Sequence, residues 1–483
     1  MSNKLLAKSL VTIIGTTGVG KSQFSIELAK ALNGEIINAD SMQIYADLPQ
    51  ITNKHPVAER AGIPHHLLGH VGWENSEYSV KEFEREALAK IAEIHARGKL
   101  PILVGGTHYY NQAIMFKNST IGGGGDDAGS APAEKTLTTE QLGILDGPSA
   151  GVLAKLREVD AEVANKFHPN DTRRIRRALE IYFQTGQRPS EIYEAQRADN
   201  TDEKLKLRFD KTLVFWIWCE QSVLNPRLDT RVDAMLRNGL HDEIRELFQY
   251  YTAHRPEKLG GVYQVIGFKE FLPWLEAGGD MTAGEPTGES AKLLQECVDK
   301  MKQRTRKYSK QQTKFMKNTL MPKLAEMVEQ EPARTDIAAA VLDATDLTQW
   351  DTTVAAHGID IARKFFTPEE NGSAAAVPEH FIADTPALRS LMVTPKSFTR
   401  EQWQNFTCDT CVDPETKEPV VVVGSDSWAV HLKSRKHRNA VAGRAKMAHN
   451  RAQMELRRKR QLEEQEQPCG GEEKRHEGEQ PKA

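Results

Sequence analysis

The sequence predicts an α/β fold, a parallel sheet core that carries a helical insertion and a small C-terminal module. Three observations support this fold. The stretch GTTGVGKS, residues 15 to 22, lies between an apolar run and a helical pattern. Further strand-like runs, GEIINAD and LPILVGG, alternate with helical patterns, as in a parallel sheet. A Cys-x-x-Cys pair and two histidines follow near the C-terminus.

The first motif matches Gly-x-x-x-x-Gly-Lys-Ser at every fixed position, the pattern of a P-loop. Its glycines let backbone N–H groups turn toward an anion, and the N-terminus of the following helix adds about half a positive charge. Lys21 supplies a full charge, and Ser22 can offer its hydroxyl to Mg²⁺. We expect a site for a diphosphate or for a nucleotide such as ATP, with an unliganded glycine-rich turn as the alternative. The predicted phosphate site is Gly15, Thr16, Thr17, Gly18, Val19, Gly20, Lys21 and Ser22.

Length and charge define the broad class of the protein. A chain of 483 residues is too long for one core, so we expect two or three domains. The net charge of -3 hides a segment, 431–460, with eleven Lys or Arg and one Glu, followed by an acidic tail. Five cysteines indicate a reducing compartment rather than a disulfide scaffold. Since no apolar run of about 18 residues occurs, we expect no membrane span. We also expect a monomer located in the cytoplasm, with mitochondrial and nuclear pools left open.

The domain organisation follows from changes in pattern along the chain. A low-complexity stretch begins at Asn118, helix-rich sequence follows, and the strand-like run KTLVFWIWC returns the chain to the sheet. Beyond Gln330 the periodicity fades. The predicted boundaries are a P-loop core over 1–117 and about 205–325, a mostly helical insertion over 118–204, a partly helical linker over 326–398, a zinc finger over 399–445, and a basic helix with an acidic tail over 446–483.

Two further predicted strands end in residues that can do chemistry. In INADSMQIY a strand ends at Asp40, which lies at the edge where open α/β sheets bind ligands. Asp40 can hold a metal or accept a proton, or it can simply cap the next turn. In LVGGTHYY the strand ends in Gly105, Gly106 and Thr107, where a nucleotide hydrolase has an acid for magnesium. This difference argues against motor-type NTPases, although small-molecule kinases often lack that acid too.

Two predicted helices are rich in basic residues. HPNDTRRIRRALEIY has Asp171 as a natural N-cap and is either a solvated face or a phosphate-binding surface. The long helix predicted over 291–318 has an apolar seam and a separate basic face. Two such helices in one lobe favour RNA or DNA binding. The arginines are Arg173, Arg174, Arg176 and Arg177, the seam is Met301, Tyr308 and Phe315, and the basic face is Arg306, Lys310, Lys314 and Lys317.

The C-terminal motif combines FTCDTC with WAVHLKSRKHR. Cys408 and Cys411 form Cys-x-x-Cys, and His431 and His437 follow with five residues between them. These spacings are typical of a structural two-Cys, two-His zinc site. The 19 residues between the pairs exceed the usual ~12 to 15, and a longer hairpin would absorb the difference. Because we expect both histidines to lie on one helix rich in Lys and Arg, we expect the finger to contact nucleic acid.

Together these motifs resemble those of the tRNA dimethylallyltransferases, also called tRNA isopentenyltransferases. The resemblance extends to about residue 320, and the C-terminal finger resembles that of the eukaryotic branch. Two glycine-rich insertions depart from the family pattern, but both lie between motifs. The resemblance implies transfer of a dimethylallyl group from its diphosphate to N6 of the adenosine 3′-adjacent to the anticodon. The motifs are GTTGVGKS, INADSMQIY, GIPHHLLG, VGGTHYY, HPNDTRRIRRALE, RVDAML, YQVIGFKE and RKYSKQQTKF.

The same resemblance implies roles for single residues. The phosphate loop would hold the diphosphate leaving group through Lys21, with a magnesium ion at Ser22. Asp40 would take the amine proton, Thr107 would lie beside the bridging oxygen, and Arg231 would support the diphosphate. The residues implied in tRNA binding are Asp40, Ser41, Met42, Gln43, Thr107, Arg173, Arg174, Arg177, Gln196, Lys310 and Lys314.

Two other functions fit parts of the sequence. The phosphate loop alone supports a P-loop kinase of a small molecule equally well. An RNA-binding protein whose finger is the working part would leave the phosphate loop, Asp40 and Thr107 without a purpose. The strand that ends in Thr107 and the two basic helices favour the transferase.

Overall fold

The computed structural model divides into two compact units. Unit 1 comprises Met1–Ala131 and Gln196–Ser397, and unit 2 comprises Pro132–Ala195 and Phe398–Ala483. No helix in the described part of the chain is long and apolar enough to cross a membrane. The structure describes residues 8–117, 137–194, 206–256, 259–282, 284–366, 380–392, 405–413 and 418–465.

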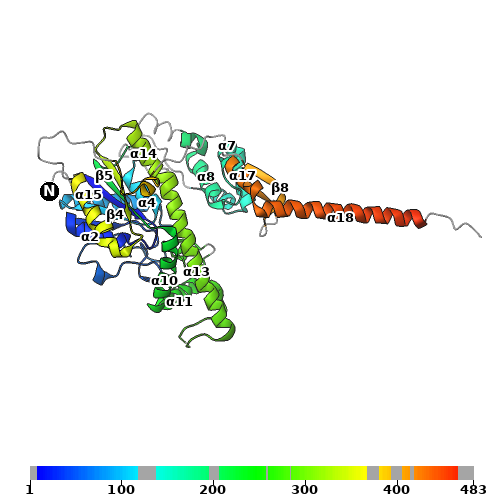
Figure 1. Ribbon diagram of the computed structural model, residues 1–483, viewed down its shortest axis with the longest axis horizontal. Coiled ribbons are helices and arrows are strands. Elements are labelled where there is room, and N and C mark those ends of the chain that lie inside the picture. The colour runs from blue at the N-terminus through cyan, green and yellow to red at the C-terminus, as the bar shows by residue number, and fades with distance from the viewer. Residues whose placement is uncertain are drawn as a thin grey trace, which may run out of the picture. The chain divides into compact units, whose positions relative to one another are not determined.

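Seven parallel strands form the sheet of unit 1, in the order β3-β2-β4-β1-β5-β6-β7. Figure 1 shows the sheet, with β4 and β5 labelled, among the helices of this unit. β1 lies between β4 and β5, so the predicted parallel core and the return of the chain as a strand after residue 210 are confirmed. The strands are β1 (Ser9–Gly15), β2 (Gly34–Asn38), β3 (His65–His66), β4 (Leu100–Val104), β5 (Lys211–Trp218), β6 (Ile337–Asp343) and β7 (Phe381–Ala383).

Helices cover both faces of this sheet. Successive residues of a strand point to opposite faces, so Val11 and Ile13 of β1 pack with α2 and α15, whereas Leu10 and Ile14 pack with α3, α4 and α14. Burial of both faces explains why β1 is mostly apolar, with only Ser9 and Thr12 as polar residues. The helices are α2 (Lys21–Leu32), α3 (Val80–Ala96), α4 (His108–Met115), α14 (Met321–Gln330) and α15 (His357–Phe366).

The linker that the sequence predicted over 326–398 is wrong for the described residues of that range. β6 pairs in parallel with β5, and β7 pairs with β6, so this segment completes the sheet. The sequence of β6, IAAAVLD, is buried on both faces and therefore shows no alternation. Its three alanines have low β propensity, which hides the strand from a pattern search. The segment also contributes α15 and the short α16 (Pro386–Arg389).

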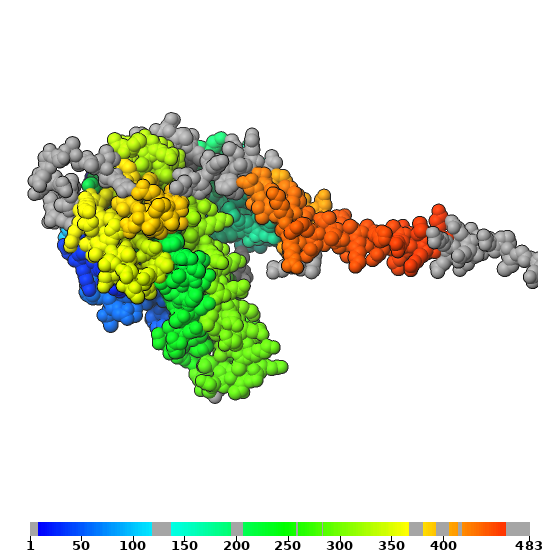
Figure 2. Space-filling model, in the orientation of Figure 1, coloured from blue at the N-terminus to red at the C-terminus, as the bar shows by residue number. Residues whose placement is uncertain are grey.

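A cluster of helices extends unit 1 beyond the sheet. α10 and α13 lie side by side, as the space-filling view shows (Figure 2). Lys302 of α13 forms an ion pair of 2.5 Å with Asp233 of α10, and Arg306 pairs with Asp229. These ion pairs hold α13 against α10, and one of them engages Arg306 of the predicted basic face. The helices are α10 (Gln221–Arg237), α11 (Leu240–His254), α12 (Phe268–Glu276) and α13 (Gly288–Phe315).

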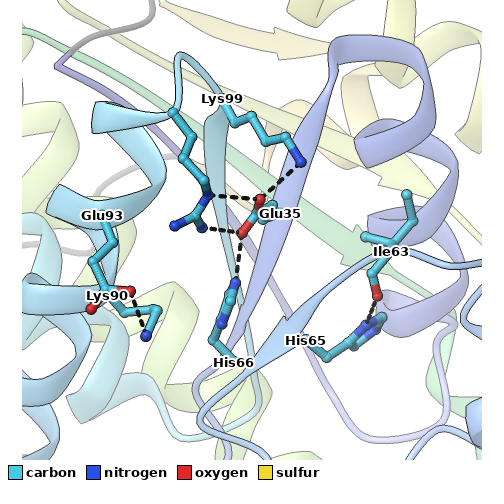
Figure 3. A network of polar contacts seen from close by, with 8 residues as sticks. Glu35, Ile63, His65, His66, Lys90, Glu93 and Lys99 are labelled. Carbon is cyan, nitrogen blue, oxygen red and sulfur yellow. Dashed lines mark hydrogen bonds and ion pairs between the residues drawn. The ribbon is translucent and has the colours of Figure 1, made fainter.

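A buried carboxylate anchors the amino-terminal side of the sheet. Glu35, near the start of β2, is 2% exposed and is surrounded by Arg97, Lys99 and His66 (Figure 3). Burial raises the pKa of Glu35, but the hydrogen bonds from these three side chains outweigh it and lower the pKa to about 2. This cluster lies at the end of β2 opposite to the phosphate loop, so we interpret it as structural.

Unit 2 joins the helical insertion to the C-terminal finger. Nε2 of His168 is 2.8 Å from Val421 O, and Asn405 Nδ2 donates to Asn165 O at 2.9 Å. These contacts lie more than 200 residues apart in sequence, which explains why the sequence analysis treated the two parts as separate domains. The elements are α5 (Thr139–Leu145), α6 (Ser149–Val159), α7 (Ala161–Lys166), α8 (Thr172–Thr185), β8 (Asn405–Val412), β9 (Pro419–Val423), α17 (Ser425–Lys433) and α18 (Arg435–Gln465).

Candidate active site and metal cluster

The phosphate loop links β1 to α2 as the motif predicted. Gly20 caps α2 with a φ of 88°, a conformation that favours glycine, and leaves the first amides of the helix open at its N-terminus. A Cβ at Gly20 would lie 2.6 Å from the ring of Trp350, which therefore packs directly on the loop. Lys21 Nζ donates to Thr16 O at 2.7 Å, within the loop. The loop thus offers N–H groups and an ammonium group at one point.

Two cations and one carboxylate meet at this loop. Burial lowers the pKa of Lys21 to about 8, Asp40 opposes the change, and Arg231 adds to it. Burial lowers the pKa of Arg231 to about 10, again against Asp40. Burial and the charge of Lys21 lower the pKa of the adjacent His108 to about 3, so this imidazole is neutral. The site therefore has a surplus of positive charge, which suits a diphosphate.

Asp40 and Thr107 follow β2 and β4, at the carboxyl edge of the sheet. Asp40 Oδ1 accepts a hydrogen bond from Met42 N at 3.0 Å. Thr107 Oγ1 accepts from Ser41 N at 2.9 Å and donates to Ser41 Oγ at 3.1 Å. The predicted residues of the two strand ends are thus brought together, with one oxygen of Asp40 outside the Met42 hydrogen bond.

Helix α13 contributes two residues to this site that the sequence analysis did not assign to it. Tyr308, assigned there to an apolar seam, hydrogen-bonds to Thr107 and Gln312, and burial and the charge of Asp40 raise the pKa of its phenol. Gln312 Oε1 accepts from Thr17 N at 2.9 Å, and Nε2 donates to Gly106 O at 3.1 Å. The rest of the seam is confirmed, since Met301 is buried and Phe315 stacks on His108. No spacing rule in the motif RKYSKQQTKF marks Tyr308 or Gln312 as site residues.

A cavity of about 260 Å³ opens beside these residues. Its lining combines polar groups with an apolar wall. Such a lining suits a ligand with one charged and one apolar part. The polar lining includes Thr17, Asp40, Ser41, Gln43, Arg231, Arg304 and Tyr308, and the apolar wall includes Ile51, Leu228, Val232, Met235, Val265, Ile266 and Met301.

The basic residues predicted to contact tRNA differ in their surroundings. In α8, Arg174 pairs with Asp171 and Arg177 pairs with Glu180, as expected for a solvated face. Arg173 is exposed, as are Lys310 and Lys314 of α13. Gln196 lies outside the described residues.

The four predicted metal ligands lie together in unit 2. Their ligand atoms all lie within 4.8 Å of one another, and His437 Nδ1 is 3.5 Å from each sulfur. Zinc bonds of about 2.0 to 2.3 Å in a tetrahedron separate ligand atoms by about 3.3 to 3.8 Å. Both distances from His437 to the sulfurs lie in this range, and two thiols with two imidazoles are a donor set that suits zinc. Cys408 and Cys411 come from β8, which pairs with β9 in the expected hairpin.

The two histidines of this cluster lie on two helices rather than one. α17 carries His431 and α18 carries His437, and the chain is extended at Ser434 between them. Ser434 Oγ accepts from His437 N at 3.1 Å, which starts the second helix. Trp428 stacks on His431 with 5.3 Å between ring centroids, so an aromatic side chain supports the cluster from α17.

Comparisons with known proteins agree with this arrangement. The model of the IPP transferase family matches residues 43–319, and that of isopentenyl transferase matches residues 8–67. The tRNA dimethylallyltransferase of Saccharomyces cerevisiae is 40% identical over 441 residues, which cover 90% of this chain and 92% of that protein. The human tRNA dimethylallyltransferase is 31% identical over 447 residues, with 91% and 87% covered. A crystal structure of a eukaryotic dimethylallyltransferase acting on tRNA matches with a TM-score of 0.72 and 40% identity, covering 92% of this chain and all of that one.

Proposed function

This chain belongs to the tRNA dimethylallyltransferase family, and we propose how its own residues perform the reaction of that family. The protein transfers a dimethylallyl group from dimethylallyl diphosphate to N6 of the adenosine 3′-adjacent to the anticodon of tRNA, giving N6-isopentenyladenosine. The observation that carries the proposal is the meeting of Lys21, Arg231 and Asp40 at the phosphate loop, beside a cavity with polar and apolar walls.

The phosphate loop binds the diphosphate, which is the leaving group. N–H groups at the start of α2, the ammonium of Lys21 and the guanidinium of Arg231 stabilise the charge that develops as the carbon–oxygen bond breaks. Ser22 lies in the first turn of α2, where its hydroxyl can ligate Mg²⁺. Magnesium would neutralise part of the diphosphate charge when it is bound.

Asp40 acts as the general base. The exocyclic amine of adenine is a poor nucleophile because its lone pair is delocalised into the ring. As its nitrogen bonds to the allylic carbon, the electron pair of the old carbon–oxygen bond leaves with the diphosphate, and Asp40 takes the amine proton. Removing that proton avoids a buried cation. Thr107 is held by the N–H group of Ser41, and in this proposal it would lie beside the bridging oxygen of the diphosphate.

The apolar wall of the cavity holds the dimethylallyl tail. Ile51, Val232 and Met301 belong to this wall. In this proposal they face the alkyl part of the substrate and not its charged diphosphate. A dry surface around the allylic carbon limits hydrolysis of the diphosphate by water. The enzyme can therefore hold a reactive ester until the adenine arrives.

The basic surfaces bind the tRNA backbone. The target base must leave the anticodon stack, at a cost of a few kcal/mol, and phosphate contacts offset that cost. Exposed Lys310, Lys314 and Arg173 supply such contacts, together with Ser41 to Gln43 near the base. The cysteine and histidine cluster holds a structural zinc ion that fixes the finger, whose basic helix adds to RNA binding.

Transfer of a labelled group tests the proposal against a kinase. The purified chain is incubated with total tRNA, magnesium and either dimethylallyl diphosphate labelled in its alkyl group or ATP labelled in its γ-phosphate. We expect the alkyl label in tRNA and no phosphate label in any acceptor. A transferred phosphate without alkyl transfer would contradict the proposal.

A further inference from the structure

We infer that Gln312 is a positioning residue that holds the phosphate loop in register with the turn that carries Thr107. The inference rests on the roles proposed above for that loop and that threonine. Gln312 lies on α13 and is 4% exposed. Its amide oxygen accepts from Thr17 N at 2.9 Å and its amide nitrogen donates to Gly106 O at 3.1 Å. One side chain thus joins the loop after β1 to the loop after β4.

The two backbone partners determine the orientation of the amide. Thr17 N can only donate a hydrogen bond and Gly106 O can only accept one, so a rotated amide would face donor with donor and acceptor with acceptor. A leucine of similar size would leave both buried backbone groups without this partner. A carboxylate would satisfy Thr17 but oppose Gly106 O. Glutamine is the neutral side chain of this length that serves both.

The backbone at Gly106 is shaped for this contact. A Cβ at Gly106 would lie 2.4 Å from Gln312 Nε2 and 3.4 Å from Asp40 Oδ2. Because Gly106 has no side chain, the amide of Gln312 can reach the backbone that follows β4, beside Asp40. Tyr308, one turn earlier on α13, hydrogen-bonds to both Gln312 and Thr107 and closes the network.

The hydrogen bond between Thr17 and Gln312 also affects which N–H groups of the loop are available to the substrate. Because Thr17 N donates to Gln312, this N–H group is already engaged and leaves a bound anion to the other amides of the loop and the start of α2. The spacing between these amides and Thr107 sets the distance from the leaving group to the threonine. Misalignment of about 1 Å at a reacting centre can lower a rate about 100-fold. Gln312 should therefore affect the chemical step much more than tRNA binding.

Single-turnover rates of two variants test this role. Gln312→Leu removes both hydrogen bonds, and Gln311→Leu on the exposed side of the same helix is the matched control. With saturating tRNA and dimethylallyl diphosphate, we expect Gln312→Leu to slow transfer by about tenfold to 100-fold while the Kd for tRNA changes less than threefold. Gln311→Leu should stay within twofold of the wild type. A Gln312→Leu rate within twofold of the wild type, measured well below its melting temperature, would overturn the inference.

A pH-dependent rescue separates positioning from a merely structural role. A protonated carboxyl has one acceptor and one donor, like an amide, so Gln312→Glu should regain both hydrogen bonds when protonated. Burial raises the pKa of such a carboxyl, and Tyr308, Asp40 and Lys21 are the titratable groups around it. We expect the rate of Gln312→Glu, divided by that of the wild type at each pH, to rise as the pH falls from about 9 to about 6, while the Gln312→Leu ratio stays flat.

The outcomes distinguish this inference from the proposed function. A flat ratio for Gln312→Glu would overturn the positioning role even if Gln312→Leu fails to fold. Failure of the proposed chemistry would appear instead in the wild type, which is measured in the same experiment and would then transfer no dimethylallyl group.

Discussion

The lowered pKa of Lys21 predicts that the enzyme uses dimethylallyl diphosphate less efficiently above about pH 8. Burial, with Arg231 acting in the same direction, lowers this pKa from 10.5 to about 8 despite Asp40. At about 1.4 kcal/mol per pKa unit, the empty site disfavours the ammonium form by roughly 3 kcal/mol. Below pH 8 the diphosphate meets a cation that is already present. Above pH 8 the amine must first take a proton from solvent, so kcat/KM should fall by up to about tenfold per pH unit.

The assay is kcat/KM for dimethylallyl diphosphate at saturating tRNA, between about pH 7 and pH 9.5. Lys21→Arg is the matched control because a guanidinium keeps its charge throughout this range. We expect a fall above pH 8 in the wild type and a flat profile in Lys21→Arg, whatever its absolute activity. A flat wild-type profile, or an equal fall in both proteins, would refute the reasoning, since neither could arise from titration of Lys21.

The remaining predictions concern the metal and the RNA surface. Metal analysis should find one zinc per chain, and Cys408→Ser should lose it, with weaker tRNA affinity but residual transfer; retention of the zinc would remove Cys408 from the ligand set. The double variant Lys310→Ala and Lys314→Ala should reduce the slope of log Kd for tRNA against log salt by roughly 1.4 to 1.8, at about 0.7 to 0.9 per lost phosphate contact. Lys30→Ala on α2 is the control, and an unchanged slope in the double variant would place the RNA elsewhere.

Local sequence patterns were enough to predict the strand–loop–helix arrangement around residues 15–22 and the cluster of two cysteines and two histidines. The loop from Gly15 to Ser22 is a continuous motif, and its strand and helix are marked by apolar periodicity on either side. Cys408 and Cys411 are likewise a local pair on one strand, and their histidines follow the hairpin on the short α17 and at the start of α18. In such cases the backbone conformation follows from neighbouring residues, and the spacing alone indicates the chemistry.

The residues that complete the site could not be predicted from local patterns, because they lie far from the phosphate loop in the sequence. Gln312 contacts Thr17 from 295 residues away, and Trp350 packs on Gly20 from a segment that looked like a linker. An isolated glutamine or tryptophan has no spacing rule that announces a role. Their positions depend on β6 pairing within the sheet and on α13 packing with α10 and α12, and tertiary structure of this kind overrides local propensity.

The single-turnover rate of Asp40→Asn tests whether Asp40 is the general base. Asparagine has nearly the same shape and can still accept the hydrogen bond from Met42 N, but it cannot take a proton from the amine. We expect the single-turnover rate of dimethylallyl transfer to fall by about 10² to 10⁴ while the Kd for tRNA stays within a few-fold. A rate close to that of the wild type would contradict the assignment of Asp40 as the base, and a matching loss of tRNA affinity would make it a structural residue.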